Sequence, residues 1–406
     1  MKRIGSFIIL LLISSVSACG IEKADNLQAY EEPVAEAVVT EAVKEPVKEE
    51  VREPEISVVT ESVNEPDQTV NIIMVGDILL HTPVEEAAKN DETGIYDFDF
   101  IFDNSKDKIS SADIAIANQE VIIGGEDLKV SGYPAFNAPY EIGDALCDAG
   151  FDVICHATNH ALDKGKKGIL NCLDYWRTNH PDIVVTGIYD NEADASYDSI
   201  PVIEKNGIRI AILNYTYGTN GIAPPSDMPY AVSMLDKERV VTQLDLAEET
   251  ADFTIVCPHW GVEYNLGYSG EQEKWAKLFI EHGADAVIGT HPHVIEPLVM
   301  YEDVPVYYSL GNFVNWTSGT GKGVANRMVG GMADITISRK DDGNVSIDEC
   351  LVRDYVCHVE SGDENVTVYP LEEYSDELAS KNEIIRQDGS FSRKYCEDLV
   401  NSVYDR

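Results

Sequence analysis

The chain has 406 residues and a formal net charge of −42, because 72 acidic residues outnumber 30 basic ones. A surface this acidic repels nucleic acid phosphates and anionic lipid headgroups, so we expect no nucleic-acid partner and no broad electrostatic attachment to a membrane. An anionic substrate would need local cations, either metal ions or a few arginines.

The first 19 residues have the pattern of a secretory signal. Lys2 and Arg3 precede a short apolar run, Ile4–Val16, which small residues follow directly. The run is too short for an ordinary membrane-spanning helix. Its end, Val16-Ser-Ala-Cys19, resembles the lipobox of bacterial lipoproteins, which implies that Cys19 is lipidated and anchors an extracytoplasmic protein to the cell membrane. An ordinary signal peptide with an incidental cysteine is the alternative.

Residues 20–69 consist largely of Glu, Val, Pro and Ala, with one aromatic residue, Tyr30. Such a composition cannot bury enough apolar surface to fold alone, and its prolines interrupt helices. We therefore expect a disordered acidic tether that holds the folded part away from a membrane. A spacer without a specific partner explains the same composition.

From Val70 onward the chain alternates between strand and helix patterns, which predicts a large α/β domain over residues 70–355 and a C-terminal extension over 356–406. Short apolar runs predict buried strands at 70–75, 113–117, 152–155, 183–186, 208–215, 253–257, 286–289 and 305–309. Apolar residues at helical spacing predict helices at 141–150, 166–178, 236–250 and 270–283.

Two turn signals indicate antiparallel pairing and therefore mixed sheets. Asn206-Gly207 predicts a hairpin between the runs 200–204 and 208–213. Later, an Asp-Asp-Gly-Asn turn at 341–344 separates the runs 328–338 and 345–352, which predicts an antiparallel pair.

Seven cysteines follow Cys19, and none belongs to a Cys-x-x-Cys pair. Several lie in apolar, strand-like runs, which favours buried free thiols over a disulfide framework, with a single bridge as the alternative. They are Cys147, Cys155, Cys172, Cys257, Cys350, Cys357 and Cys396.

Polar side chains follow five of the expected strands at the point where each strand ends. In chain order they are Asp77, Glu120, Asn159 with His160, His259, and His291 with His293. Since ligands of α/β sheets collect at the carboxyl ends of strands, these side chains should converge on one site. Pro292 disfavours helical geometry at His291, so we expect that residue to be extended and both imidazoles to point to the same side. Imidazoles, amides and carboxylates together suit a metal site.

The strand-end residues belong to six motifs: Gly76-Asp77, Asn118-Gln-Glu120, Asn159-His-Ala-Leu-Asp163, His259-Trp-Gly-Val-Glu-Tyr264, Gly289-Thr-His-Pro-His293 and Ser309-Leu-Gly-Asn-Phe313. In this order they resemble the motifs of the CapA family, bacterial proteins of capsule or poly-γ-glutamate synthesis related to the calcineurin-like metallophosphoesterases. The resemblance spans residues 71–313 and implies a four-layer α/β/β/α sandwich of the metallophosphoesterase type, with mixed sheets.

The resemblance also implies two divalent metal ions, which in metallophosphoesterases share a carboxylate and bind a phosphate. Oxygen and nitrogen ligands without a thiolate suit manganese, iron or zinc. Asp77 and His293 would bind the first ion, Glu120 would bridge, and the second ion would be held by Asn159, His259 and His291.

The resemblance assigns further roles around the metals. His160 would bind the phosphoryl group or protonate the leaving oxygen, and Asp163 would hold its other ring nitrogen. A structural hydrogen bond is the alternative for His160. Asn118, Glu263 and Asn312 are candidates for substrate binding, although Glu263 could be a solvated loop carboxylate and Asn312 could cap a turn.

Two departures from the metallophosphoesterase pattern bear on catalysis. Leu79 stands where the first metal has a histidine, with His81 two residues later, and Asn118-Gln-Glu120 stands where Gly-Asp is usual. Two functions in capsule or poly-γ-glutamate biosynthesis or export therefore stay open. One is a metal-dependent hydrolase acting on a phosphoester or on the polymer. The other is a non-catalytic subunit whose metal binds polymer carboxylates or a membrane synthase partner.

Overall fold

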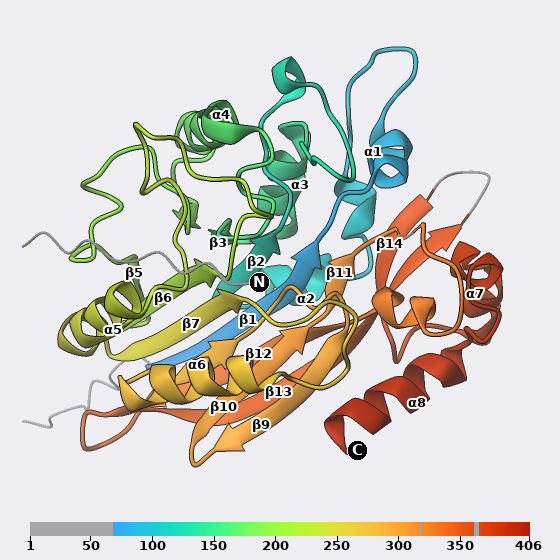
Figure 1. Ribbon diagram of the computed structural model, residues 1–406. Coiled ribbons are helices and arrows are strands. Elements are labelled where there is room, and N and C mark those ends of the chain that lie inside the picture. The colour runs from blue at the N-terminus through green and yellow to red at the C-terminus, as the bar shows by residue number, and fades with distance from the viewer. Residues whose placement is uncertain (1–67, 317, 361–364) are drawn as a thin grey trace, which may run out of the picture. The chain divides into compact units, whose positions relative to one another are not determined.

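Two β-sheets packed face to face form the centre of the described chain, and helices cover the outer face of each sheet (Figure 1). The computed structural model describes residues 68–316, 318–360 and 365–406. The predicted signal, Cys19 and the predicted tether up to residue 67 lie outside the described residues.

The first sheet has eight strands and mixed pairing. Its central strand, β1, pairs in parallel with β2 and antiparallel with β12. A further strand, β11, pairs in parallel with the end of β1. The order is β14 (Asn365–Pro370), β13 (Val345–Glu360), β12 (Val329–Arg339), β1 (Thr69–Ile78), β2 (Ile114–Gln119), β3 (Val153–Cys155) and β4 (Val184–Thr186), with β11 (Asn312–Val314) outside this path.

The second sheet has six strands, and its pairing is also mixed. Four inner strands are parallel to one another, whereas the two edge strands, β5 and β9, run antiparallel to their neighbours. The order is β5 (Val202–Lys205), β6 (Ile208–Thr216), β7 (Phe253–His259), β8 (Ala286–Ile288), β10 (Val304–Leu310) and β9 (Ile295–Tyr301).

The helices lie outside the two sheets. Those of the described residues are α1 (Thr82–Ala88), α2 (Lys106–Ser110), α3 (Glu141–Ala149), α4 (Gly165–Asn179), α5 (Lys237–Thr250), α6 (Gly270–Glu281), α7 (Asp376–Lys381) and α8 (Arg393–Tyr404), with 3₁₀ turns η1 (Asp99–Ile101), η2 (Glu126–Leu128), η3 (Val324–Met328) and η4 (Glu383–Arg386). None of these helices is both long enough and apolar enough to cross a membrane. α5 and α6 pack on the second sheet, and α3 and α4 pack on the first.

Alternating side chains of the strands fill separate apolar layers. In β1, Ile72 and Met74 belong to the cluster between the two sheets, whereas Ile73 and Val75 belong to the cluster under the outer helices of the first sheet. A third cluster lies between the second sheet and α5 and α6. The period of two along each strand therefore produces three apolar interfaces, which hold four layers together.

The expected fold class is confirmed: the protein is a mixed α/β sandwich with two mixed sheets. All strands expected from apolar runs are present, and the four expected helices begin and end within two residues of the observed ones. The hairpin β5–β6 and the antiparallel pair β12–β13 are also confirmed. The sequence patterns missed β9, β11 and β14 and the helices α1, α2 and α8, whereas α7 lies within a helical pattern at 374–385.

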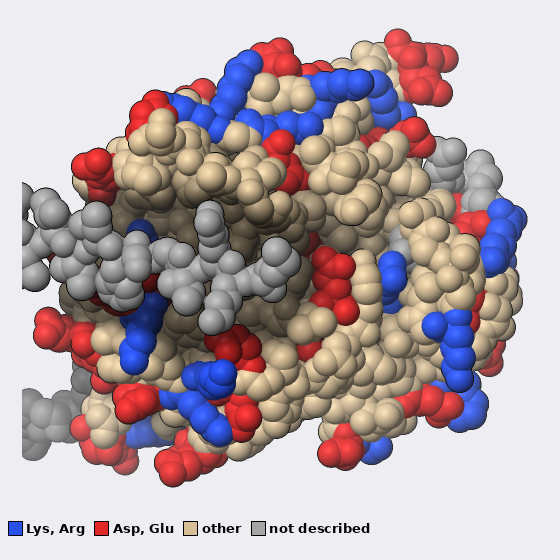
Figure 2. Space-filling view, in the orientation of Figure 1, with Lys and Arg blue, Asp and Glu red and all other residues tan. Residues whose placement is uncertain are grey.

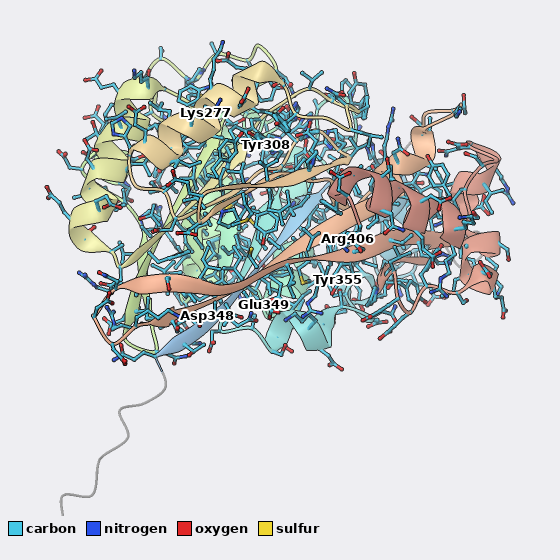
Figure 3. The ribbon with its side chains drawn as sticks, turned by 90° about the horizontal axis from the view of Figure 1, so that it is seen from below. Lys277, Tyr308, Asp348, Glu349, Tyr355 and Arg406 are labelled. Atoms are coloured by element: carbon cyan, nitrogen blue, oxygen red, sulfur yellow. The ribbon has the colours of Figure 1, made fainter. Side chains whose placement is uncertain are left out.

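The C-terminal segment continues the first sheet. β13 runs through residue 355 to Glu360, so the expected extension begins inside a strand. β14 then pairs with β13, and α8 buries one apolar face. The last residue, Arg406, donates hydrogen bonds to Asp354 Oδ2 (2.8 Å) and to the carbonyl of Val352 (3.1 Å), and Figure 3 shows it near Tyr355 of β13.

The surface shows the acidic composition. Asp and Glu side chains are spread over the face visible in Figure 2, and lysines and arginines lie among them in small groups. Several of these cations have an acidic partner, such as Lys277 with Glu273 (2.6 Å) and Lys394 with Asp398 (2.7 Å). Exposed pairs of this kind contribute little to stability, so the apolar layers hold the fold.

The cysteines after Cys19 are free thiols, as expected. Five of these seven are buried, and Cys147 and Cys350 are half-buried. Burial raises the pKa of the Cys357 thiol to about 12, which keeps it protonated and unreactive.

β1 and β11 approach so closely at Gly76 that no side chain fits between them. An ideal Cβ on Gly76 would lie 2.0 Å from the carbonyl oxygen of Gly311. The same carbonyl accepts a hydrogen bond from the amide of Asp77 (2.9 Å). Gly76 therefore fixes where Asp77 lies at the end of β1.

We expect Gly76→Ala to destabilise the protein by about 1–3 kcal/mol, because the added methyl group must displace backbone atoms. Gly389→Ala is the matched control, since a Cβ added there meets no atom within 4 Å. Denaturant unfolding followed by circular dichroism measures both variants. Equal midpoints for the two would show that the close approach is not a constraint.

Candidate metal centre

Side chains from both sheets meet at the carboxyl ends of the parallel strands. Asp77 lies near the end of β1, and Glu120 comes directly after β2. His259 ends β7, and His291 and His293 follow β8. All five side chains are buried, with at most 5% of the residue exposed. The strand ends singled out in the sequence therefore converge in space.

These five residues form two groups that share Glu120. One group is Glu120, His259 and His291, and the other is Asp77, Glu120 and His293. Within each group the candidate ligand atoms lie within 4.8 Å of one another. A carboxylate shared by two ligand sets is the arrangement of a binuclear centre. The grouping coincides with the assignment made from sequence, while metal binding itself stays a prediction.

Asp77 and His293 form the polar core of one group. Nδ1 of His293 lies 3.3 Å from Oδ2 of Asp77 and 3.7 Å from Oε2 of Glu120. Asn118 donates a hydrogen bond from Nδ2 to Oδ1 of Asp77 (2.8 Å). Oδ1 of Asn312 lies 3.0 Å from Nδ1 of His293. Both asparagines, which the sequence suggested for substrate binding, thus contact and orient candidate ligands.

His259 of the other group has contacts at both ring nitrogens. Its Nδ1 lies 3.0 Å from the hydroxyl of Thr290, which orients the ring. Its Nε2 lies 2.9 Å from Oδ1 of Asn159 and 3.8 Å from Oε1 of Glu120. The structure therefore places the amide of Asn159 beside this group.

The expected extended backbone at His291 is wrong. Its φ is 101°, and that of His293 is 59°, both in a region that residues other than glycine rarely adopt. The reason is a set of tertiary hydrogen bonds: the His291 amide donates to Oδ1 and Oδ2 of Asp77 (3.3 and 3.2 Å), and the carbonyl of Pro292 accepts from the Tyr264 amide (2.7 Å). Two candidate ligands thus carry backbone strain, as is common at functional sites.

Three buried ligand atoms have no hydrogen-bond partner among the described residues. They are both carboxylate oxygens of Glu120 and Nδ1 of His291. A buried polar atom without a partner costs free energy, and a buried charge costs more. Cations bound to these atoms would remove that cost, so the residues fit a pair of divalent metal ions. The set has no thiolate, which suits manganese, iron or zinc.

The same environment shifts the pKa values of the groups. Burial raises the pKa of Glu120 well above its ordinary value; His293 opposes this rise and Asp77 adds to it. Burial, and then the neighbouring histidines, lower the pKa values of His259 and His291 well below normal. Burial alone would lower the pKa of His293, but Glu120 and Asp77 raise it to about 9. Two of the three imidazoles are thus already neutral, which is the form that binds metal.

His160 lies at the edge of this centre and is held firmly. Its Nε2 is 3.9 Å from Oε1 of Glu120, and its Nδ1 is 2.6 Å from Oδ2 of Asp163. Asp163 also accepts from the amide of Phe136 (2.8 Å), whose ring packs edge-on against His160 with centroids 4.6 Å apart. The expected pair of His160 and Asp163 is therefore present, and its catalytic role stays a prediction.

Other positions singled out in the sequence lie at the periphery. Glu263 is exposed on the loop after β7, although its charge still raises the pKa of Glu120. Leu79 is buried and has no ligand atom. His81 caps the start of α1 and packs its ring against Phe136 (centroids 5.2 Å apart). Among the described residues, neither ligand group includes His81.

Two residues that contact the centre were missed from sequence. The ring of Tyr217 lies 4.5 Å from that of His291. Asn220 lies between two candidate residues, with Oδ1 3.3 Å from Nδ2 of Asn159 and Nδ2 3.3 Å from Nδ1 of His160. The signal was available, because the polar segment that contains them follows a predicted strand, β6, as at the other five strand ends.

Fold and site together define a two-sheet α/β domain with a candidate binuclear metal centre. The chain belongs to the family of bacterial capsule synthesis proteins called PGA_cap, whose model matches residues 71–317, more than half of the chain. This agrees with the resemblance noted from the motifs.

Two relatives have assigned names. The capsule biosynthesis protein CapA of Bacillus anthracis is 30% identical over 263 residues, which cover 62% of this chain and 62% of that protein. The PGA biosynthesis protein CapA of Bacillus subtilis is 35% identical over 178 residues, which cover 42% of this chain and 45% of that protein. The match thus spans less than two thirds of the length of either relative.

Similar solved structures include two nucleotidases. The NAD nucleotidase of Haemophilus influenzae has a TM-score of 0.41 and 14% identity, over 82% of this chain and 62% of that one. A 5′-nucleotidase of Candida albicans has a TM-score of 0.40 and 11% identity, over 83% and 58%.

His156 begins the loop that carries Asn159 and His160 but points to the helices outside the first sheet. Its Nε2 accepts a hydrogen bond from Nε1 of Trp176 (3.1 Å), and Sγ of Cys172 lies 3.6 Å from the same nitrogen. Burial lowers the pKa of His156 from 6.5 to about 3. The imidazole is therefore neutral in the folded protein at any pH near 7.

Because the unfolded chain protonates His156 near pH 6.5, the stability from the neutral imidazole is lost as the pH falls from 6.5 towards 3. In His156→Gln, the amide oxygen can still accept from Trp176 but no longer titrates. We expect this variant to reduce the proton uptake on unfolding by about one proton near pH 5. The slope of the unfolding free energy against pH, measured at stepwise pH values, gives this proton uptake. Equal slopes for the wild type and His156→Gln would contradict the burial of a neutral His156.

Proposed function

We propose that this member of the capsule synthesis family is a metal-dependent hydrolase with a binuclear centre. The observation that supports the proposal is the pair of buried ligand groups that share Glu120, whose oxygens have no hydrogen-bond partner among the described residues. Three imidazoles and two carboxylates buried together are costly unless cations balance them. Such a centre is therefore explained by metal binding better than by packing.

Divalent metal ions bound there would supply Lewis acidity toward an anionic oxygen of a substrate. The side chains of the two ligand groups, with Asn159 beside His259, would hold the ions. Asp163 binds Nδ1 of His160, which leaves Nε2 on the side of Glu120. As an imidazolium paired with the Asp163 carboxylate, His160 would give its Nε2 proton to the oxygen that leaves and become neutral.

The proposed substrate is a phosphoester or the anionic polymer itself. Poly-γ-glutamate is joined by amide bonds, so its synthesis does not itself require a phosphoesterase. Hydrolysis would therefore act on a phosphorylated precursor or trim the polymer. We also propose that the protein acts at the outer face of the cell membrane beside synthase subunits, anchored through Cys19, because residues 1–19 have the pattern of a lipoprotein signal.

One observation favours a second function, a metal-dependent subunit that binds the polymer without catalysis. Leu79 occupies the position of a metal-binding histidine in metallophosphoesterases, and it is buried with 5% exposure. The group around Asp77 and His293 then has one imidazole and two carboxylates. A centre with fewer strong ligands would still bind polymer carboxylates through its cations.

Metal content tests the proposed centre directly. We expect the purified protein to carry about two divalent ions per chain, Glu120→Ala to lose both, and His291→Ala to lose one, because Glu120 belongs to both groups. His282→Ala is the matched control, since that partly exposed imidazole pairs with Asp245 (3.2 Å) outside the site. No bound metal in elemental analysis, even after reconstitution with manganese, iron or zinc, would refute the metal centre.

Replacing His160 separates the two functions. For a hydrolase, His160→Ala should lower turnover of a panel of phosphomonoesters and of γ-linked glutamate polymer by about 100-fold or more, as expected for loss of a general acid, with metal content unchanged. For a binding subunit, the same variant should leave polymer production in cells nearly normal while His291→Ala impairs it. Steady-state kinetics and polymer yield therefore decide between them.

A further inference from the structure

A small pocket lies directly beside the candidate metal centre. Its volume is about 230 Å³, and His293 and Asn312 form one side of it. The other sides include His81, Tyr133, Tyr264 and Arg327. A pocket of this size takes a group as large as a side chain and is smaller than the sites that hold whole drug-sized ligands. It is therefore a place for one part of a larger substrate.

The charge of the pocket is opposite to that of the chain. The net charge of the chain is −42, yet none of the described residues that line the pocket is Asp or Glu, and Arg327 supplies a cation. The two tyrosines expose much of their surface, 77% for Tyr133 and 47% for Tyr264. A pocket that is lined by an arginine and by no carboxylate, in a protein that is otherwise acidic, favours the binding of an anion.

Arg327 is fixed in position by contacts of both its side chain and its backbone. The guanidinium carbon lies 3.6 Å from the centre of the Tyr264 ring, a cation–π contact that orients the planar group. The carbonyl of Arg327, in η3, accepts from Nδ2 of Asn312 (3.0 Å), and Oδ1 of the same amide faces Nδ1 of His293 at 3.0 Å. Arg327 is thus coupled through one side chain to a candidate metal ligand.

We propose that this pocket binds a second anionic group of the substrate, a carboxylate or a phosphate, through Arg327, while the reacting group lies at the metal centre. The guanidinium has five N–H donors in a fork that matches both groups, and stacking on Tyr264 fixes the plane of that fork. This rests on the proposed function, because it takes the metal centre as the place where substrate binds. It names the substrate class as one with at least two anionic groups, such as a chain with a carboxylate on every unit.

The test is calorimetric titration of the metal-loaded, full-length protein with two probes, a short γ-linked glutamate oligomer and inorganic phosphate. We expect Arg327→Ala to bind one probe roughly 10- to 100-fold more weakly, as for loss of a charged hydrogen-bond partner, and Arg327→Lys to retain part of the affinity. If Arg327→Ala loses affinity for the oligomer alone, the group bound in the pocket is a carboxylate of the polymer. If it loses affinity for phosphate alone, the bound group is a phosphate. Tyr264→Phe, which keeps the ring, should match the wild type, whereas Tyr264→Ala should not.

Lys322→Ala is the matched control, because it removes an exposed cation of the same segment that does not line the pocket. Equal affinities in Arg327→Ala and Lys322→Ala, or no binding of either probe to the wild type, would overturn the inference. Metal content and thermal melting of every variant separate this result from loss of the centre or of the fold. If the protein binds no metal but Arg327→Ala still weakens binding, the proposed hydrolase fails and the anion subsite stands. If the protein binds metal but Arg327→Ala leaves binding of both probes unchanged, the anion subsite fails and the proposed metal centre stands.

Discussion

The carboxylate of Glu120 is the group on which the rest of the site depends. It is fully buried, neither oxygen has a hydrogen-bond partner among the described residues, and it belongs to both ligand groups. A carboxylate in this state is tolerated only where cations or protons compensate it. Its burial between two sheets raises the pKa of Glu120. The same position requires imidazoles around the carboxylate and asparagines that orient them.

Backbone geometry brings that arrangement about. Gly76 allows β1 to touch Gly311 and so places Asp77, while positive φ angles at His291 and His293 turn their imidazoles inward. Neither feature adds stability, since one removes packing volume and the other strains the chain. Their cost is offset by the three apolar layers, and this division between a rigid scaffold and a strained site is common in enzymes and binding proteins.

Much of this could be predicted from the sequence, because its signals are local. Apolar runs of strand length gave the inner strands, and the polar residue after each run gave Asp77, Glu120 and His259, since parallel strands end at one edge. The missed features depend on contacts across the fold. β11 has three residues and exists only by pairing with β1, and His291 adopts its φ because of Asp77, 214 positions away. Arg327 reaches the site from η3, where no strand pattern points to it.

The two sheets contribute different ligands, with the carboxylates on the first and the imidazoles on the second. A cation bound between them would therefore join the halves of the sandwich and resist their separation, as any ligand specific for the native state does. The first and last of these residues, Asp77 and His293, are also far apart in the chain. Such a centre would form only where both sheets are in place, so metal binding there would depend on the folded sandwich.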